Sequence, residues 1–278
     1  MVYAGKGFRI KWILIHLFLI VYAITVIYPT IIVILNAFKS NQEIFNKPYG
    51  FPSHFSLKNF TAAWDEANFS VYFKNSIFVS IASILLVLLL SSMAAYVLAR
   101  FKFKGNFVIY FIFLLGLMLP LRLAIIPLYL IIRDLHLLDT FIGLILVYVA
   151  SGLSFSIFIL YTFFKNIPNE LLEAARMEGA NAFQIYYKIM LPLVKPALST
   201  VAIFNFMSYW NDFFFPYILM SSPEKFTIPV GIASFFGEYT TDWSLLFAGL
   251  SISIIPVIII FFIMSKQFIQ GLTAGAIK

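Results

Sequence analysis

Six long apolar runs constrain the fold of this 278-residue chain more than any other feature. A helix that spans a lipid bilayer needs about 20 mostly apolar residues, and each run is long enough. Only 11% of the residues are charged, well below the roughly one quarter typical of soluble proteins, which argues against a large soluble core. We therefore expect an all-α, polytopic membrane protein whose six transmembrane helices cover about 12–38, 77–99, 107–132, 141–164, 193–220 and 243–265.

The first apolar run follows three basic residues, as the core of a signal peptide would. The run is too long for a signal peptide, however, and no small-residue cleavage site follows it, so we expect a retained span. The chain contains no low-complexity tract and no soluble stretch of domain size. We expect residues 1–278 to form a single transmembrane domain.

The distribution of charge predicts the orientation of the chain in the membrane. Six spans place both termini and the segments 100–106 and 165–195 on one side, where the acids number only three. Basic residues collect on the cytoplasmic side, so we expect both termini there. The net charge of +7 is then an orientation signal and indicates no nucleic-acid partner. The basic residues on that side are Lys6, Arg9, Lys11, Arg100, Lys102, Lys104, Lys165, Arg176, Lys188, Lys195, Lys266 and Lys278.

The longest cytoplasmic segment, 165–195, is predicted to form two short helices that meet at a corner. Pro168 suits the first turn of the first helix, because the missing N–H costs nothing there. Leu171, Leu172 and Ala175 have the spacing of one apolar helix face. Gly179 is typical of a left-handed cap at the end of a helix.

The second helix of this segment has its own start and stop signals. Asn181 and Gln184 have the spacing of a capping box. Pro192 is expected to stop the helix, because proline cannot continue the hydrogen-bond ladder. The small side chains of Ala174 and Ala175 would let another surface approach the first helix closely. The alternative is a surface helix that rests on lipid headgroups.

The residues of this loop resemble the EAA loop of bacterial ABC importer permeases. The family pattern is Glu-Ala-Ala, three residues, Gly, nine residues, Ile, one residue and Leu-Pro, and every position matches from Glu173 to Pro192. The resemblance implies the type I ABC importer permease fold. It also implies that the first helix is a coupling helix, which sits in a cleft of a separate ATPase. The residues assigned to ATPase coupling are Glu173, Ala174, Ala175, Arg176, Glu178 and Gly179.

Three further stretches resemble the carbohydrate-uptake (MalG-like) branch of the same family. They are Tyr209–Phe213 followed by Pro216, the outer segment Thr227–Gly231, and the tail Gln270–Ala276. By resemblance, the outer loop 221–242 faces an extracytoplasmic binding protein, and its Phe235–Tyr239 stretch is expected to help expel the solute.

The chain lacks the phosphate-binding loop that ATP hydrolysis requires. An importer of this type therefore needs partners, and the resemblance implies two nucleotide-binding ATPase subunits, a second permease subunit and an extracytoplasmic binding protein. ATP and magnesium would be bound by the ATPase subunits. We expect no catalytic residue, cofactor or metal site in this chain, since His16, His54 and His136 lie in separate segments.

The fifth span carries the strongest candidates for contact with a solute. Asn205, Ser208, Tyr209 and Asp212 share one helical face, and Trp210 and Asn211 lie beside it. Amides, carboxylates and aromatic rings are suited to sugar hydroxyls and sugar rings. Three alternatives remain open: these groups hydrogen-bond to a neighbouring span, the second permease makes most solute contacts, or Asp212 forms a structural ion pair.

Arg122 is a second charge inside the apolar runs, directly after the break expected at Pro120. It is expected to donate to carbonyls freed by the proline or to extend outward to the membrane surface.

We expect a permease subunit of a sugar or oligosaccharide importer in the bacterial cytoplasmic membrane. A polyol, glycerol phosphate or a peptide is an alternative solute. A secondary transporter is disfavoured, because the sequence shows no clear inverted repeat and Asp212 is the only acid inside the spans. A membrane enzyme would need paired acids, clustered histidines or an activated nucleophile, and the spans contain none of these.

Overall fold

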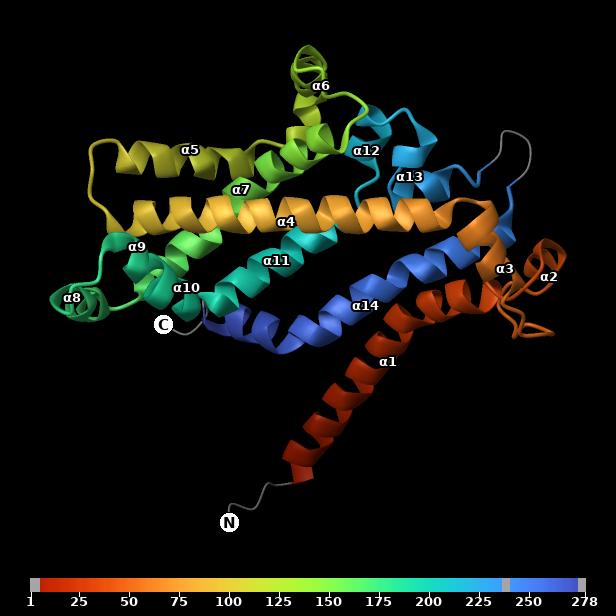
Figure 1. The fold of residues 1–278 in the computed structure, drawn as a ribbon. Coiled ribbons are helices and arrows are strands. Elements are labelled where there is room, and N and C mark those ends of the chain that lie inside the picture. Colours follow the sequence, from red (N-terminus) through yellow and green to blue (C-terminus); the bar gives the residue numbers. More distant parts are fainter. Residues whose placement is uncertain (1–5, 237–240, 275–278) are drawn as a thin grey trace. The chain divides into compact units, whose positions relative to one another are not determined.

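The computed structural model describes the backbone of residues 6–236 and 241–274, and the side chains of 11–65, 67–236 and 241–264 (Figure 1). Over these ranges the chain is helical, and its one β feature is an isolated bridge between Phe236 and Thr241. The α-helices are α1 Lys6–Asn36, α2 Asn41–Asn46, α3 Lys58–Thr61, α4 Phe69–Arg100, α5 Asn106–Met118, α6 Ile125–Asp134, α7 Phe141–Asn166, α8 Asn169–Met177, α9 Ala182–Gln184, α10 Leu191–Leu193, α11 Lys195–Trp210, α12 Phe214–Leu219, α13 Ile228–Ala233 and α14 Trp243–Ala274.

Short stretches of other helix types complete this order. Two are 3₁₀-helices, η2 Leu121–Ala124 and η4 Pro223–Lys225, and two are π-helices, η1 Ala62–Glu66 and η3 Ile185–Met190. The outer segment predicted between the first two spans therefore holds three short helical pieces, α2, α3 and η1.

Four described helices are long and apolar enough to cross a bilayer alone: α1, α4, α7 and α14. Two pairs of helices joined at a bend are also long and apolar enough when each pair is taken together, which raises the number to six. The first pair is α5 with η2 and α6, and the second is the stretch α9–α10 with α11. The expected number of six is reached if each bent pair is counted as one span, but the second pair includes Ala182–Leu193. This stretch belongs to residues 165–195, the loop predicted to be cytoplasmic and called the cytoplasmic loop from here on. The first pair bends by 88° and the second by 73°.

The bend in the third span confirms the break expected at Pro120. Helix α5 ends at Met118, and Leu119 and Pro120 are extended before η2 begins. The fifth span is less continuous than predicted, since α11 ends at Trp210 and α12 starts only at Phe214.

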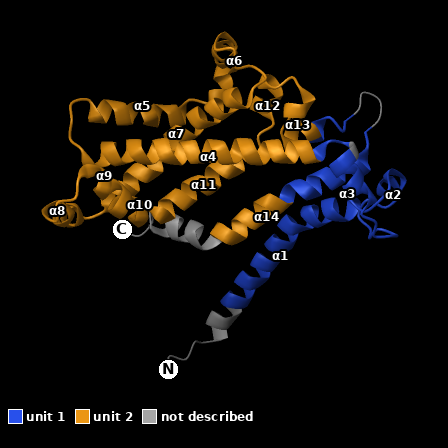
Figure 2. Ribbon diagram, viewed as in Figure 1, with its two compact units in different colours: residues 1–69, 232–254 blue, residues 70–231, 255–278 orange. Residues whose placement is uncertain are grey.

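The described chain divides into two compact units, coloured separately in Figure 2. Unit 1 comprises 1–69 and 232–254, and unit 2 comprises 70–231 and 255–278. Each unit is discontinuous in sequence. The assignment of the whole chain to one transmembrane domain stays a prediction.

Unit 1 contains an apolar helix with no buried residues in its most apolar stretch, followed by an outer segment that is held by hydrogen bonds. The most apolar 18-residue stretch of α1 has no residue buried inside the structure. After α1, the fully buried Lys39 donates from Nζ to Asn36 Oδ1 and to the carbonyl of Lys47, both at 2.8 Å. Burial lowers the pKa of Lys39, whereas the nearby Glu43 acts in the opposite direction. The ammonium thus fixes the path of the chain that leaves the first span.

Unit 2 is built around α7, which packs against α5, α11 and α12. One apolar cluster lies at the cytoplasmic loop, residues 165–195, and includes Phe164, Leu172 and Met190. A second cluster includes Leu144, Tyr148 and Phe215. A helix buried on several sides must be apolar around most of its circumference, and α7 has buried residues along its length. Helix α7 therefore joins the two regions where candidate functional residues lie.

Candidate functional sites

The cytoplasmic loop forms the predicted pair of helices with a corner. Helix α8 ends at Met177, and Gly179 has a φ of +82°, which confirms the left-handed cap. The N–H of Gly179 donates to the carbonyl of Arg176, and the N–H of Ala180 donates to the carbonyl of Ala175, both at 3.0 Å. The corner is thus closed by local backbone hydrogen bonds.

The second helix starts with the predicted capping box. Asn181 Oδ1 accepts from the Gln184 N–H, and Gln184 Oε1 accepts from the Asn181 N–H, both at 2.9 Å. The helix continues through the π-helical η3 into α10 and ends at Leu193, one residue after Pro192, which was predicted to stop it. The break comes at Val194, before α11.

Two details of the first helix also differ from prediction. Pro168 is the N-cap residue of α8, with extended backbone angles, and does not lie in the first turn. Leu172 and Ala175 are buried, but Leu171 is 44% exposed and belongs to the free surface of α8. The apolar face that α8 turns to its own unit is therefore narrower than predicted.

The residues assigned to ATPase coupling divide between these two faces. Ala175 packs into the apolar cluster below α8. In the described chain, Glu173 and Arg176 form no ion pair, so their charges remain available to another surface. Exposed on the free surface are Glu173, Ala174, Arg176, Glu178 and Gly179.

The connection from α7 to α8 is short and held by one side chain. Only Ile167 and Pro168 separate the two helices. The guanidinium of Arg100, at the end of α4, donates to the carbonyl of Ile167 and, at 2.7 Å, to Asn169 Oδ1. A displacement of α8 would therefore be transmitted to α7.

A cavity of about 330 Å³ lies beside α7 and α11. Four of the six residues predicted on the solute path, Asn205, Ser208, Tyr209 and Asp212, line it. The other two do not: Trp210 lines a separate apolar hollow, and Asn211 is exposed and donates to the Met207 carbonyl. The remaining lining residues are Arg122, Tyr148, Ser151, Gly152, Phe155, Phe204 and Phe215.

Hydrogen bonds between α7 and α11 form one wall of the cavity. The hydroxyl of Tyr209 lies 2.8 Å from the carbonyl of Tyr148 and 2.8 Å from Asn205 Oδ1. Asn205 Nδ2 donates to Ser156 Oγ at 3.1 Å, and the rings of Tyr148 and Tyr209 stack with centroids 4.6 Å apart. The packing alternative thus holds for these side chains, of which Tyr148, Asn205 and Tyr209 also line the cavity.

Gly152 makes this close approach possible. An ideal Cβ at this position would lie 2.1 Å from Tyr209 Oη and 2.4 Å from Asn205 Oδ1. A side chain of any size would therefore push α11 away from α7.

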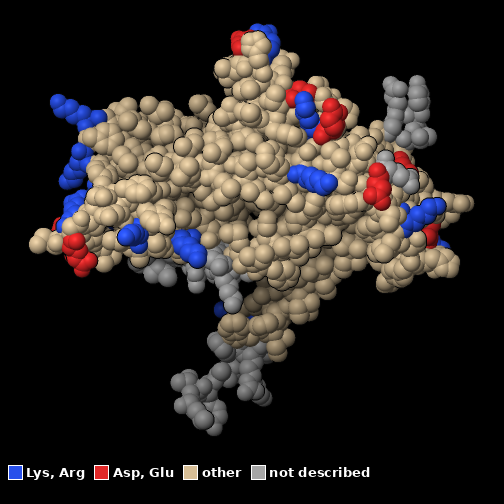
Figure 3. Space-filling view, in the orientation of Figure 1, with Lys and Arg blue, Asp and Glu red and all other residues tan. Residues whose placement is uncertain are grey.

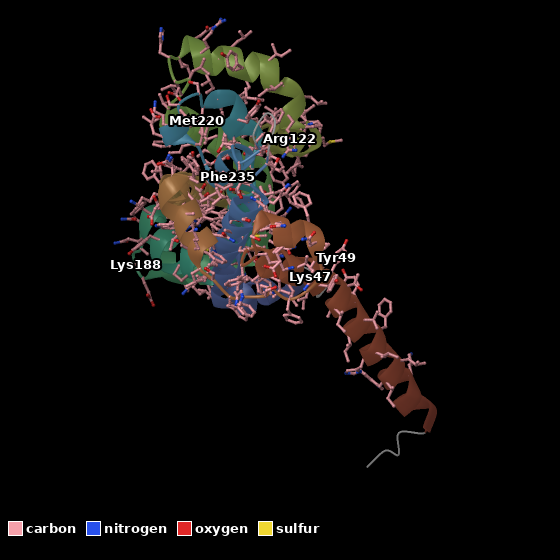
Figure 4. The ribbon with its side chains drawn as sticks, turned by 90° about the vertical axis from the view of Figure 1, so that its right-hand side faces the viewer. Lys47, Tyr49, Arg122, Lys188, Met220 and Phe235 are labelled. Atoms are coloured by element: carbon pink, nitrogen blue, oxygen red, sulfur yellow. The ribbon has the colours of Figure 1, made fainter. Side chains whose placement is uncertain are left out.

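Asp212 and Arg122, the two charges noted inside the predicted spans, meet at the cavity. Asp212 is buried, with a side chain 6% exposed, and accepts from the Tyr148 hydroxyl at 3.1 Å and the Phe215 N–H at 3.2 Å. Arg122 approaches it to 3.7 Å and lies over the Phe214 ring, yet its side chain is 69% exposed. Figure 4 shows Arg122 at the level of Met220, directly after α12. Each charge lies where a helix is interrupted.

Sequence reasoning missed the α7 side of the cavity. Tyr148, Ser151, Gly152 and Phe155 lie in an apolar run whose hydrophobicity hid them. The available signal was the pair Gly152 and Ser156, because small residues four apart permit close helix packing in membranes.

Hydrogen bonds to Asp139 join the connection between α6 and α7 to the connection between α12 and α13. Its carboxylate accepts from the N–H groups of Ser221 and Ser222, both at 3.0 Å, and from Lys225 Nζ at 2.8 Å. Burial alone would raise the pKa of Asp139, but the hydrogen bonds from Lys225, Ser222 and Ser221 hold it well below its usual value.

The expected roles of the outer loop and tail fall partly beyond what the structure describes. Gly237–Tyr239 lie outside the described residues, as do Gly275 and Ala276 of the tail. Within the described ranges, no three His, Asp or Glu side chains gather as metal ligands. The expectations of no metal and no cofactor stay predictions.

Comparisons with known proteins support the resemblance noted in the sequence. The family described as "Binding-protein-dependent transport system inner membrane component" matches residues 87–273. The diacetylchitobiose uptake system permease protein NgcG of Streptomyces coelicolor is 37% identical over 95% of this chain and 88% of its own length. The probable starch degradation products transport system permease protein AmyC of Thermoanaerobacterium thermosulfurigenes is 36% identical, covering 93% and 94%.

A solved structure has the same fold. The crystal structure of a bacterial ABC transporter involved in the import of the acidic polysaccharide alginate matches with a TM-score of 0.85 and 26% identity. The match covers 96% of this chain and 100% of that one. The expected all-α, multi-pass ABC importer permease fold is thereby confirmed. With a family match over most of its length, this chain belongs to the inner membrane components of binding-protein-dependent transport systems.

Proposed function

We propose that this chain is the permease subunit of an ATP-binding-cassette importer for an oligosaccharide. A binding protein delivers the solute outside the cytoplasmic membrane of a bacterium, and two separate ATPase subunits supply the energy. A second permease subunit completes the translocation path. In the membrane orientation predicted from the distribution of basic residues, both termini and α8 face the cytoplasm. The relatives named for diacetylchitobiose and starch products support a sugar as the solute.

One observation carries the mechanism: α7 runs from the cavity wall directly into the exposed coupling helix. Tyr148 and Gly152 contribute to the cavity, and only two residues separate the end of α7 from α8. A rigid, capped helix transmits motion where a flexible loop would absorb it. Movement of an ATPase bound to α8 would thus reach the contacts between α7 and α11.

In this proposal the free surface of α8 binds the ATPase. Glu173, Arg176 and Glu178 present charges for complementary groups, and Ala174 with Gly179 leaves room for close contact. Ala175 supports the helix from beneath, since it is buried.

In the cavity, Ser208 and the wall formed by Asn205, Tyr209 and Asp212 would face the solute. Their hydroxyl, amide and carboxylate groups suit a polyhydroxylated molecule. Trp210 and Asn211 belong to the surroundings of the path and have no role in lining it.

An acidic saccharide is a second candidate solute, because Arg122 brings a largely exposed guanidinium to the cavity. Arg122 pairs with Asp212 only at 3.7 Å and its side chain is 69% exposed, so its guanidinium can also meet a carboxylate of the solute. The likeness to the alginate importer favours the same candidate.

Uptake by the reconstituted complex tests the proposal. With both permeases, the ATPases and the binding protein in proteoliposomes, oligosaccharide uptake should require ATP and the binding protein and stop with vanadate. Uptake driven by a proton or sodium gradient without ATP would contradict it. Comparing neutral and uronate-containing oligosaccharides in Arg122→Gln would separate the two solutes: only acidic uptake should fall if Arg122 selects charge.

A further inference from the structure

A second hollow, of about 600 Å³, lies at the corner between α4 and α5. It is lined by the end of α4, the connecting residues, the start of α5, and Tyr161 and Asn169. All of these belong to unit 2. The hollow is separate from the cavity beside α11, and the proposed transport cycle assigns it no role.

The hollow is strongly cationic. Arg100 and Lys102 line it, and Lys104 belongs to the same connection. Lys165 Nζ lies over the ring of Tyr161, which lines the hollow, 5.5 Å from the ring centroid. In the described part of the chain, none of these four side chains is within ion-pair distance of a carboxylate. Figure 3 shows Lys and Arg side chains gathered at this end of unit 2. An anion is therefore the complementary ligand.

Two polar features of the corner also favour an anion. Arg100 Nε is buried and has no hydrogen-bond acceptor among the described residues, although the terminal nitrogens are bonded to Asn169 and Ile167. Helix α5, which is 13 residues long, begins inside the hollow, and no side chain caps its first turn. The N–H groups at the start of a helix favour negative charge.

Beside the cationic hollow lies an entirely apolar surface. None of the residues of α5 is buried, and Phe107, which lines the hollow, is 75% exposed. Val108 and Phe111 continue this exposed surface along α5. A ligand that satisfies both parts must combine an anionic head with apolar chains.

We propose that this corner is a binding site for one anionic phospholipid of the cytoplasmic leaflet, such as phosphatidylglycerol. The phosphate lies among Arg100, Lys102 and Lys104 at the start of α5, and the acyl chains lie along Phe107 and Phe111. A basic pocket between helices on the cytoplasmic side suits an anionic headgroup. The site goes beyond the proposed transport function and relies only on its orientation in the membrane.

Native mass spectrometry of the full complex tests the site. Complex purified with a mixture of phosphatidylglycerol and phosphatidylcholine should retain phosphatidylglycerol, and Lys102→Gln/Lys104→Gln should weaken retention roughly ten- to thirtyfold, since each cation near the surface contributes about fivefold. The matched control Lys47→Gln/Lys58→Gln removes the same charge from exposed positions in unit 1 and should leave retention unchanged.

Two further arms identify the source of the phosphate. Millimolar inorganic phosphate should fail to displace the lipid, and Phe107→Ser should weaken retention of long-chain more than of short-chain phosphatidylglycerol. Displacement by inorganic phosphate would overturn the lipid assignment. Equal retention of both lipids, or unchanged retention in the lysine variant, would do the same. If the lysine variant assembled less well with the ATPase subunits but retained the lipid unchanged, the corner would be a protein interface, and the lipid assignment would also be overturned.

Discussion

The corner of the cytoplasmic loop at Gly179 and the polar cavity belong to the same unit but are held by hydrogen bonds of very different range. The bonds that shape the loop join Gly179 to Arg176 and Asn181 to Gln184, three residues apart. In the cavity wall, the bonds between α7 and residues 205–212 join positions 49 to 64 residues apart, such as Asn205 with Ser156 and Tyr148 with Asp212.

This difference predicts how the two regions respond to substitution. The loop keeps its shape wherever the local backbone conformation is kept, so a change there should affect coupling more than stability. The cavity exists only where α7 and α11 stay packed, so a change there should affect stability and transport together. Substitutions in both regions, and in the long-range Asp139 contacts, test this contrast.

The largest effect is expected from Gly152→Ala. The new Cβ would overlap Tyr209 Oη and Asn205 Oδ1, so we expect a loss of about 3 kcal/mol in the free energy of unfolding. Thermal unfolding of the complex in detergent measures it. Gly50→Ala is the control, because its Cβ would make an ordinary contact with Lys47 at 3.5 Å. Equal stability of the two variants would show that the close approach of α7 and α11 is not required.

Asp139→Asn should cost about 1–3 kcal/mol at neutral pH, because hydrogen bonds to a charged carboxylate are lost. The pKa of Asp139 is lowered in the folded protein, so its contribution is complete above the unfolded value of about 3.9. It is lost as the pH falls through the folded pKa. The stability difference between wild type and variant should therefore shrink in acid. A difference that is constant from pH 7 to pH 3 would refute the role of the charge.

Gly179→Val tests the loop side of the contrast. Nothing lies within 4 Å of a Cβ there, so the expected strain of about 1–2 kcal/mol comes from the positive φ alone. Global unfolding should change little, while ATP hydrolysis continues and uptake falls. Gly179→Asn should keep most of the uptake, since asparagine tolerates this conformation. Normal uptake by the valine variant would show that the corner does not orient the coupling helix.

The smallest effect is expected from the ion pair at the cavity. A double-mutant cycle with Arg122→Gln and Asp212→Asn should give a coupling below about 1 kcal/mol, since Arg122 is largely exposed and the pair is 3.7 Å apart. Asp212→Asn alone should be more harmful than Arg122→Gln, because Asp212 is the buried partner. A coupling of several kcal/mol would instead place this pair among the main contacts of the cavity.

Local chemistry in the sequence determined the number of spans, the break at Pro120, the corner at Gly179 and the capping box after it. These features depend on residues a few positions apart, so propensity and spacing suffice to predict them. The resemblance to the EAA loop came from the same short-range spacing of residues. At Pro192 the local rule was off by one residue, because the helix runs on to Leu193 before it ends.

Tertiary structure alone decided which polar groups meet. The sequence placed Asn205, Tyr209 and Asp212 on one helix face, but α7 supplied Tyr148 and Gly152, and the bend after α5 brought Arg122 to Asp212. It also turned Trp210 away from the cavity and exposed Leu171. Such pairings depend on how whole helices pack against each other. The sequence of an apolar helix gives little information about which face will contact the polar residues of a neighbouring helix.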